Sequence, residues 1–367
     1  MYKLLRTLLF MLDAELSHRL VLSGLRLLYM VPGFGALLRR ATRFSSPMLE
    51  MDCMGIHFPN PVGVAAGLDK NARYYRPLLD LGFGFIELGT VTPRPQTGNS
   101  PKRMFRIPRK HAIINRMGFP SIGAEHFARN LRRHGKHGVI GVNIGKNKTT
   151  PNEKAVEDYL AAFRSIYGLA DYVAINISSP NTPHLRTFHQ QDKLLELLTP
   201  LKNEQVMLGK TRRVYMPIAL KVSPDLKDEE IDNIARIAVE QKLDAIIATN
   251  TTISREGIED ELLSTEPGGL SGRPLKDKST EVIRKFYNRL QGKVPIIGVG
   301  GIENADDAWN KMVAGADLLQ IYTGFIYEGP MLAKHICTGL ARRVQASGCE
   351  SLKEALAKAR SGIHMMR

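Results

Sequence analysis

Amides, hydroxyls, glycines and two lysines gather at the ends of eight short apolar segments of this chain. The most polar of these ends reads Asn176-Ile177-Ser178-Ser179-Pro180-Asn181, and others carry Asn143, Asn250 and the lysines Lys70 and Lys221. Four asparagines are poor core residues in such places, because a buried amide is costly unless all its donors and acceptors find partners. We therefore predict that they bind a planar heterocycle rich in carbonyl and N–H groups.

Glycines follow the last two of these segments, at Gly300-Gly301 and at Gly324. Glycines there leave backbone N–H groups free to hold a phosphate. Taken singly, each motif has an ordinary interpretation: Ser-Ser-Pro-Asn also forms turns, Gly-Val-Gly-Gly is a weak motif, and a lone lysine is usually solvated. Their combination predicts a bound phosphorylated cofactor.

The elements that carry these residues are short Val-, Ile- and Ala-rich runs separated by longer helical stretches. Such runs are typical of strands buried on both faces of a parallel sheet, and eight of them predict an α/β fold, a closed (β/α)8 TIM barrel with its active site at the carboxyl ends of the strands. A doubly wound open sheet is the alternative. Residues 91–138 and 251–280 interrupt the repeat, and we expect these insertions to be lids or binding segments. The runs are Val62-Ala66, Phe85-Leu88, Val139-Ile144, Tyr172-Ile177, Pro217-Val222, Ala245-Ala248, Pro295-Val299 and Leu318-Ile321.

Composition narrows the class of protein. The 367 residues are 43% hydrophobic and 24% charged, which is ordinary globular usage and excludes disorder or a coiled-coil rod. A net charge of +15 favours anionic partners such as phosphates, carboxylates, nucleic acid or acidic lipid. Three cysteines at no metal-ligand spacing argue against a disulfide scaffold, a zinc site or a secreted protein.

The first 43 residues are rich in leucine and basic side chains. One apolar stripe runs along residues 4–12 and, after Asp13 as a helix N-cap, a second runs along residues 16–28 and stops at Pro32-Gly33. We therefore expect two amphipathic helices, which either lie in a lipid interface, as the basic side chains favour, or pack on the body. The longest apolar stretch, Leu8 to Leu12, is too short to span a bilayer, and no signal-peptide cleavage pattern follows it.

Eight motifs resemble one family when they are taken together. They occur in the order Ala-Gly-Leu-Asp-Lys, Gly-Thr-Val-Thr-Pro-Arg-Pro-Gln, Ile-Asn-Arg-Met-Gly-Phe, Asn-Ile-Gly-Lys-Asn, Asn-Ile-Ser-Ser-Pro-Asn-Thr-Pro, Ala-Thr-Asn-Thr-Thr, Gly-Gly-Leu-Ser-Gly-Arg-Pro-Leu and Gly-Val-Gly-Gly-Ile. The set spans almost the whole chain and resembles the quinone-dependent, membrane-associated class 2 of the dihydroorotate dehydrogenases. The resemblance implies an FMN enzyme of pyrimidine biosynthesis that oxidises dihydroorotate to orotate and passes the electrons to ubiquinone. It also implies a membrane and quinone segment at residues 1–44 and a catalytic barrel at residues 45–367.

By the same resemblance, Ser179 is the base that removes the C5 proton while hydride leaves C6 for the flavin N5, and Thr182 and Phe119 frame a proton exit path. Lys221 is expected near the N1/O2 edge of the flavin. The implied substrate contacts are Lys70, Asn115, Arg116, Met117, Gly118, Phe119, Asn176, Asn181, Asn250 and Thr251. The implied FMN contacts are Ala66, Gly67, Leu68, Asp69, Lys70, Thr90, Asn143, Asn176, Lys221, Thr249, Gly272, Gly301, Tyr322 and Thr323.

The resemblance further places His18, Arg106 and Tyr322 along a quinone tunnel, although His18 read alone is equally an exposed helix histidine. The expected setting is the cytoplasmic face of a bacterial inner membrane, with the protein a peripheral monomer that binds no metal and no nucleic acid. One position departs from the family pattern, because His184 stands where a glycine usually precedes Leu185-Arg186. This loop follows the base and is expected to move as a lid, so losing the glycine should alter how it closes.

Three other functions compete with this interpretation. The soluble class of the same enzyme uses a cysteine base, but Cys53, Cys337 and Cys349 all lie outside the strand-end loops. A flavin barrel acting on RNA, such as a dihydrouridine synthase, would suit the positive charge but also needs a cysteine. A non-catalytic membrane adaptor would not need the strand-end amides.

Overall fold

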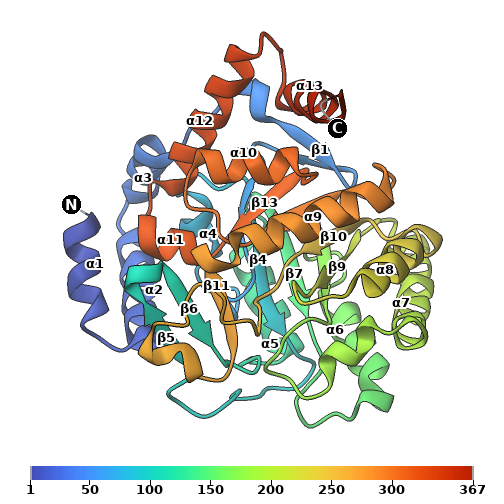
Figure 1. Ribbon diagram of the computed structural model, residues 1–367. Helices are drawn as coiled ribbons and strands as arrows, with labels where there is room; N and C mark the ends of the chain where they lie inside the picture. Colours follow the sequence, from blue (N-terminus) through green and yellow to red (C-terminus); the bar gives the residue numbers. More distant parts are fainter. Residues whose placement is uncertain (1, 366–367) are drawn as a thin grey trace.

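The computed structural model describes residues 2–365 and shows a closed barrel of eight parallel strands surrounded by helices (Figure 1). The barrel excludes the doubly wound open sheet. Neighbouring strands follow the order β10-β12-β13-β3-β4-β7-β8-β9, with β9 closing on β10. The strands are β3 (Val62–Val64), β4 (Phe85–Val91), β7 (Val139–Ile144), β8 (Tyr172–Asn176), β9 (Ile218–Val222), β10 (Ala245–Ala248), β12 (Ile296–Val299) and β13 (Leu318–Ile321).

These strands coincide with the eight predicted apolar runs. Every residue in them except Val139 is buried, as expected for strands covered on both faces. Three strands have the predicted bounds, and the other five differ from the prediction by one to three residues at one end. Pro217 and Pro295 stand just before β9 and β12 because proline has no N–H for the ladder, and β4 continues to Val91.

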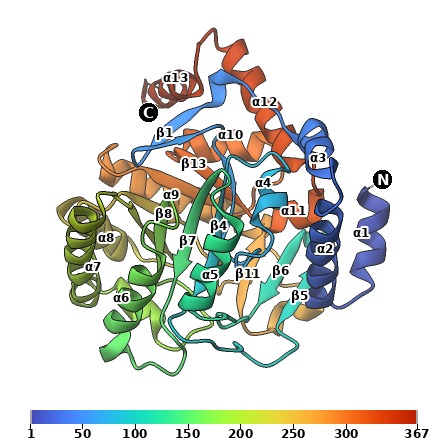
Figure 2. The ribbon, with the colours of Figure 1, turned by 180° about the vertical axis from the view of Figure 1, so that it is seen from behind.

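An outer ring of helices covers the barrel, as the two opposite views show (Figures 1 and 2). An antiparallel hairpin of β1 (Met51–Cys53) and β2 (Ile56–Phe58) precedes β3. Short 3-10 turns lie at residues 47–49, 108–110, 152–154, 185–189, 262–265 and 273–275. The helices are α4 (Tyr75–Leu79), α5 (Ala124–His134), α6 (Ala155–Ile166), α7 (Gln191–Arg212), α8 (Asp228–Glu240), α9 (Lys276–Leu290), α10 (Ala305–Val313), α11 (Thr323–Glu328), α12 (Leu332–Ala346) and α13 (Leu352–Met365).

The two insertions join into a second, three-stranded antiparallel sheet. β5 (Met104–Ile107) and β6 (Ala112–Asn115) come from the first insertion, and β11 (Gly269–Gly272) from the second pairs with β6. Pairing fixes Gly269 opposite Asn115 and Gly272 opposite Ala112. The sheet therefore holds Asn115 and the residues that follow it beside the strand ends.

The N-terminal segment folds into three helices: the two predicted helices are confirmed, and a third was not predicted. They are α1 (Tyr2–Phe10), α2 (Ala14–Tyr29) and α3 (Phe34–Thr42). The N-cap prediction is confirmed, since the Asp13 carboxylate accepts hydrogen bonds from the N–H groups of Glu15 and Leu16. Pro32-Gly33 ends α2 but then begins a third helix, with Gly33 in a left-handed conformation as its N-cap.

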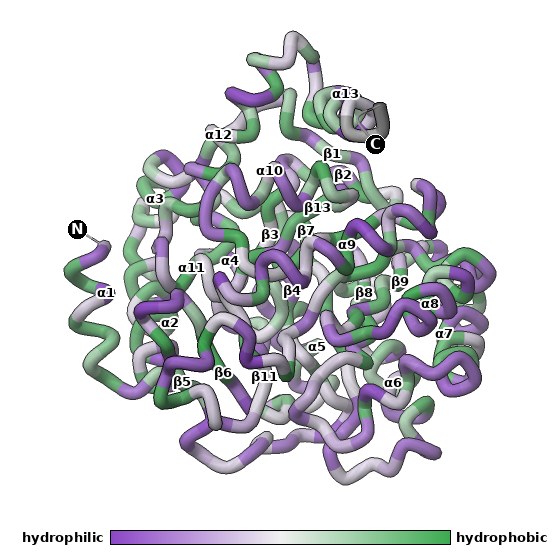
Figure 3. The backbone as a smooth tube through the Cα atoms, viewed as in Figure 1, coloured by the Kyte–Doolittle hydropathy of each residue, from purple (hydrophilic) through white to green (hydrophobic). Residues whose placement is uncertain are grey.

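The apolar stripes of α1 and α2 face solvent rather than the barrel. Leu4, Leu8 and Leu27 are more than half exposed, and Figure 3 shows hydrophobic residues along these helices at the edge of the molecule. The residues of α2 that are buried are Ala14, Ser17 and Leu22. Among residues 2–365, no single helix has the length and apolar character of a membrane span. Helices α2 and α3 would reach that length and apolar character only as a pair, and the chain bends by 116° between them.

Candidate functional site

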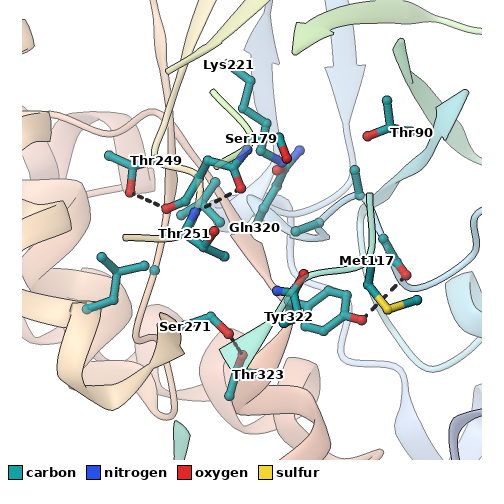
Figure 4. A pocket seen from close by; sticks show the side chains of 18 of the residues that line it. Thr90, Met117, Ser179, Lys221, Thr249, Thr251, Ser271, Gln320, Tyr322 and Thr323 are labelled. Atoms are coloured by element: carbon teal, nitrogen blue, oxygen red, sulfur yellow. Dashed lines mark hydrogen bonds between the residues drawn. The ribbon is translucent and has the colours of Figure 1, made fainter. Parts of the chain in front are cut away.

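A cavity opens at the carboxyl ends of the barrel strands, between them and the three-stranded sheet (Figure 4). The space within it, together with the open solvent at its mouth, is about 1060 Å³. Nineteen of the residues predicted for substrate, cofactor, base or tunnel line it. They are Ala66, Gly67, Lys70, Thr90, Asn115, Met117, Gly118, Phe119, Asn176, Ser179, Asn181, Lys221, Thr249, Asn250, Thr251, Gly272, Gly301, Tyr322 and Thr323.

The asparagines of the strand ends form one connected network. The Asn176 amide donates to Asn143 Oδ1 at 3.1 Å, and its own Oδ1 accepts from Asn250 Nδ2 at 3.3 Å. Asn143 Oδ1 also accepts from the Thr90 hydroxyl at 2.5 Å. Because each of these amides has protein partners that fix its rotamer, the network presents ordered donors and acceptors at the cavity wall.

A fully buried carboxylate lies beneath this wall. Glu87, on β4, accepts hydrogen bonds from Asn143 Nδ2 at 2.9 Å, Lys221 Nζ at 3.2 Å and Gln320 Nε2 at 2.8 Å. An isolated buried ammonium or carboxylate would be strongly destabilising, so the Lys221–Glu87 pair accounts for both charges. The pair holds the Lys221 ammonium at the cavity.

The segment after β8 carries Ser179, which is buried and lines the cavity. Its Oγ accepts a hydrogen bond from the Asn181 N–H at 3.2 Å. The neighbouring carbonyl of Ser178 accepts from the Arg186 guanidinium, which also donates to the Thr251 carbonyl at 3.1 Å. Arg186 thus ties the serine segment to the strand end that carries Thr251.

Asp225 holds that arginine in place. Its carboxylate accepts from Arg186 at 3.0 Å, from Lys278 at 2.7 Å and from the Thr252 hydroxyl at 2.5 Å. These donors keep the pKa of Asp225 below its usual range despite burial, which opposes them. The carboxylate therefore connects four segments around the cavity.

Two ionisable side chains on the cavity wall have shifted pKa values. Burial lowers the pKa of Lys70 to about 8, and its ammonium donates to the Gly67 carbonyl at 2.6 Å. Burial raises the pKa of Tyr322 to about 12, and its hydroxyl lies 3.5 Å from the same carbonyl. Figure 4 shows Tyr322 close to Met117 at one side of the cavity.

Gly300 and Gly301 form a backbone wall at another side. Both have positive φ angles, 127° and 69°, which L side chains rarely adopt. A Cβ on Gly301 would lie 2.5 Å from Lys276 Cβ, at the start of α9. The glycines therefore leave their backbone facing the cavity, while Ser271 and Thr323 share a 2.9 Å hydrogen bond beside it.

Several predicted contact residues are set back from the cavity surface. Leu68 is in the hydrophobic core, and Asn143 and Thr182 are buried behind the lining. The Asp69 carboxylate accepts from the N–H groups of residues 71, 73 and 74, so it shapes the loop after β3. The Arg116 side chain forms an ion pair with Glu266 at 2.6 Å and stacks on the ring of Phe105.

Two of the predicted tunnel residues, His18 and Arg106, also lie outside the cavity lining. His18 is half-buried on α2 rather than exposed, and burial beside Lys70 lowers its pKa to about 3. The Arg106 guanidinium donates to the carbonyls of Leu9, Phe10 and Leu12 and lies 4.6 Å from the Phe10 ring centroid. Arg106 thus fixes the end of α1 to β5.

Five residues around the cavity were not predicted from the sequence: Glu87, Ser178, Asp225, Ser271 and Gln320. A signal existed for two of them, because Glu87 and Gln320 are strongly polar residues inside otherwise apolar runs. The others come from loops whose mutual placement depends on the insertions. All three cysteines are buried and none lines the cavity, so it offers no thiol base.

Comparisons with known proteins agree with this geometry. The family model described as dihydroorotate dehydrogenase matches residues 48–344. Curated relatives named dihydroorotate dehydrogenase (quinone) include one from Cellvibrio japonicus, 49% identical over 93% of this chain and 98% of its own, and one from Vibrio cholerae, 47% identical over 93% and 100%.

Solved structures of DHODH from Eimeria tenella are also similar at 37% identity. The ligand-free form has a TM-score of 0.85 and covers 94% of this chain and 98% of its own, and the ferulenol complex has a TM-score of 0.83 with 94% and 95% covered. Both the sequence relatives and the structures match along nearly the whole chain. The chain therefore belongs to the dihydroorotate dehydrogenase family, in its quinone-dependent class.

Proposed function

We propose that this protein oxidises (S)-dihydroorotate to orotate with FMN as its cofactor and a quinone as the final electron acceptor, as a step of pyrimidine biosynthesis. The observation that carries the proposal is the convergence of Ser179, the asparagine network and the lysines Lys70 and Lys221 on one cavity. A flat anionic pyrimidine needs such a set of amides and cations.

The cavity fits FMN on two counts. The Gly300-Gly301 backbone offers a phosphate cradle, because a side chain would strike Ser279 at the first glycine and Lys276 at the second. Lys221, held by Glu87, offers a fixed cation for the electron-rich edge of a flavin. Bound FMN supplies the two-electron acceptor for the hydride that leaves C6, and protein groups tune and position it. Gly272, Thr249 and Thr323 complete the cradle.

Ser179 takes the C5 proton in this proposal. A serine hydroxyl is a weak base, so its oxygen must be positioned accurately and must pass the proton onward. The hydrogen bond from the Asn181 N–H and the Arg186 bond to the Ser178 carbonyl fix the residue. Phe119 at the cavity surface and Thr182 behind it frame the path out.

Lys70 holds the substrate carboxylate, and the amides of Asn115, Asn176, Asn181 and Asn250 hold the ring. Lys70 is next to the carbonyl of Gly67 and keeps its proton below about pH 8. The backbone of residues 116–119 forms the wall over the ring, with Thr251 at its rim.

Residues 1–44 form the membrane and quinone side in this proposal, and residues 45–367 the catalytic barrel. The exposed leucines of α1 and α2 and the net charge of +15 suit a peripheral monomer at the anionic cytoplasmic face of a bacterial inner membrane. In this proposal the route of the quinone head passes His18 on α2, Arg106 on β5 and Tyr322 at the cavity wall.

The experiment is anaerobic reduction of the purified yellow protein by dihydroorotate, followed by reoxidation with decylubiquinone. We expect Ser179→Ala to keep bound flavin and to slow bleaching at neutral pH by roughly 10²–10⁴-fold, the usual contribution of a general base. Stopped-flow absorbance at the flavin band measures the rate.

Ser165→Ala is the matched control, because this serine on α6 only donates to the Ala161 carbonyl. Bleaching of Ser179→Ala at the wild-type rate would exclude Ser179 as the base. Purified wild-type protein that neither contains nor takes up flavin would refute the whole proposal.

A further inference from the structure

Helix α2 is joined to the substrate side of the cavity by a bidentate ion pair. Arg103 donates through Nε to Glu15 at 3.1 Å and through a terminal nitrogen to the other Glu15 oxygen at 2.8 Å. Both side chains are largely buried, with 11% and 20% exposed, and this pairing lowers the pKa of Glu15. A shielded, two-point pair fixes geometry far better than a single surface contact.

The remaining donors of Arg103 hold the loop that precedes β5. One terminal nitrogen donates to the Thr97 carbonyl at 2.8 Å and to the Asn99 carbonyl at 2.6 Å. The Arg103 carbonyl accepts from the Arg116 N–H at 2.9 Å. Residues 97–102 are mostly exposed, so these bonds replace packing as the source of order in the loop.

Asn99 carries that order to the cavity wall. Its N–H donates to the Met117 carbonyl at 2.9 Å, and its side-chain amide donates to the Arg116 carbonyl at 2.9 Å and approaches the Asn181 carbonyl at 3.5 Å. Lys148 donates to Asn99 Oδ1 at 2.8 Å and sets the orientation of the amide. The contacts thus run without a break from Glu15 to the wall residues 116–117 and to Asn181.

We propose that Arg103 is a positioning residue that couples helix α2 to the dihydroorotate-binding wall through Glu15 and Asn99. The proposal rests on the proposed function, since it names a determinant of substrate affinity at that site. Helix α2 then acts on both half-reactions: its apolar face serves the quinone side, and its Glu15 orders the substrate side.

The test compares Glu15→Gln, Arg103→Lys and the double variant at pH 6. At this pH Lys70 keeps its proton, so a change in KM cannot arise from a change in the protonation of Lys70. Arg103→Lys retains the charge but loses the planar fork. We expect each single variant to raise the KM for dihydroorotate by about three- to tenfold. Flavin content and the rate of reoxidation by decylubiquinone should stay within about twofold of wild type, and the double variant should be no worse than the poorer single one.

Arg19→Gln is the matched control, because Arg19 is a further cation beside Glu15, at 3.9 Å, and its side chain is exposed. Unchanged KM in Glu15→Gln, or effects that multiply in the double variant, would overturn the coupling. A higher KM in Arg103→Lys alone would also overturn the coupling, because helix α2 would then not contribute to substrate affinity. Failure of the proposed function would give a different result: dihydroorotate would not bleach the flavin of the wild-type protein.

Discussion

At the scale of single residues, the site depends on buried polar groups that stabilise one another. Glu87 has three side-chain donors from different strands besides the Tyr172 hydroxyl at 3.2 Å. A buried carboxylate without such donors would be strongly destabilising. The Lys221 ammonium is therefore fixed by the barrel interior rather than by a ligand.

Lys70 gives a prediction about pH. Burial lowers its pKa to about 8, so the ammonium is present below that pH and is lost as the pH rises through it. Orotate affinity should therefore fall above about pH 8. Titration of the flavin spectrum with orotate between pH 6 and 9 measures the dissociation constant without involving turnover.

Lys70→Arg keeps its charge across this range, so its orotate dissociation constant should be weaker but should not change with pH. A wild-type dissociation constant that is flat up to pH 9 would contradict the role assigned to Lys70.

At the scale of elements, the loop between β8 and α7 contains a strained residue. His184 has φ of 54° and ψ of 11°, in the left-handed region where glycine is favoured, and its carbonyl accepts from Asn152 Nδ2 at 2.9 Å. A non-glycine residue there costs roughly 1–2 kcal/mol. The departure from the family pattern is thus a matter of backbone conformation.

His184→Gly should raise the free energy of unfolding by about 0.5–1 kcal/mol, because the relieved strain exceeds the added chain entropy of glycine. The thermal midpoint of unfolding of the flavin-loaded protein measures this change. The rate of dihydroorotate turnover should also change, because the loop closes differently. His57→Gly is the control, since His57 lies in the extended strand β2, where glycine should only destabilise. Equal effects at both positions would exclude the strain.

At the scale of the whole molecule, apolar exposure is concentrated on the first three helices. Leu8 and Leu20 are 59% and 51% exposed, and most of the other exposed large apolar side chains also lie within residues 4–37. Exposed apolar side chains beside arginines and lysines match a lipid surface.

Leu8→Glu/Leu20→Glu should weaken binding to vesicles containing phosphatidylglycerol by at least about tenfold, because two leucines no longer enter the acyl region and two negative charges are added. Vesicle co-sedimentation measures the binding. Flavin bleaching by dihydroorotate should stay normal.

Val206→Glu/Leu262→Glu adds the same charge at exposed apolar positions elsewhere on the protein. Equal loss of vesicle binding in both double variants would mean that net charge, rather than the helices, directs the protein to lipid.

Local pattern was enough to predict the strands and most of the cavity. Apolar runs of four to six residues are typical of strands buried in a closed or covered sheet, and polar residues at their carboxyl ends then share one mouth. Ser179, Asn176, Asn250 and Lys221 were therefore identifiable from local pattern. The number of N-terminal helices could not be identified in this way, because a Pro-Gly pair can either end one helix or begin the next.

The contacts between distant residues depend on the complete fold. The pairing of β6 with β11, the Arg186–Asp225 contact and the Glu15–Arg103 pair each join segments separated by 39 to more than 100 residues. Nothing in the local periodicity specifies such partners, because they follow from the closure of the barrel and from the route of the two insertions across its mouth. For the same reason, the ion pair between Glu87 and Lys221 could not be predicted from the sequence, because it depends on how the strands are arranged in the barrel.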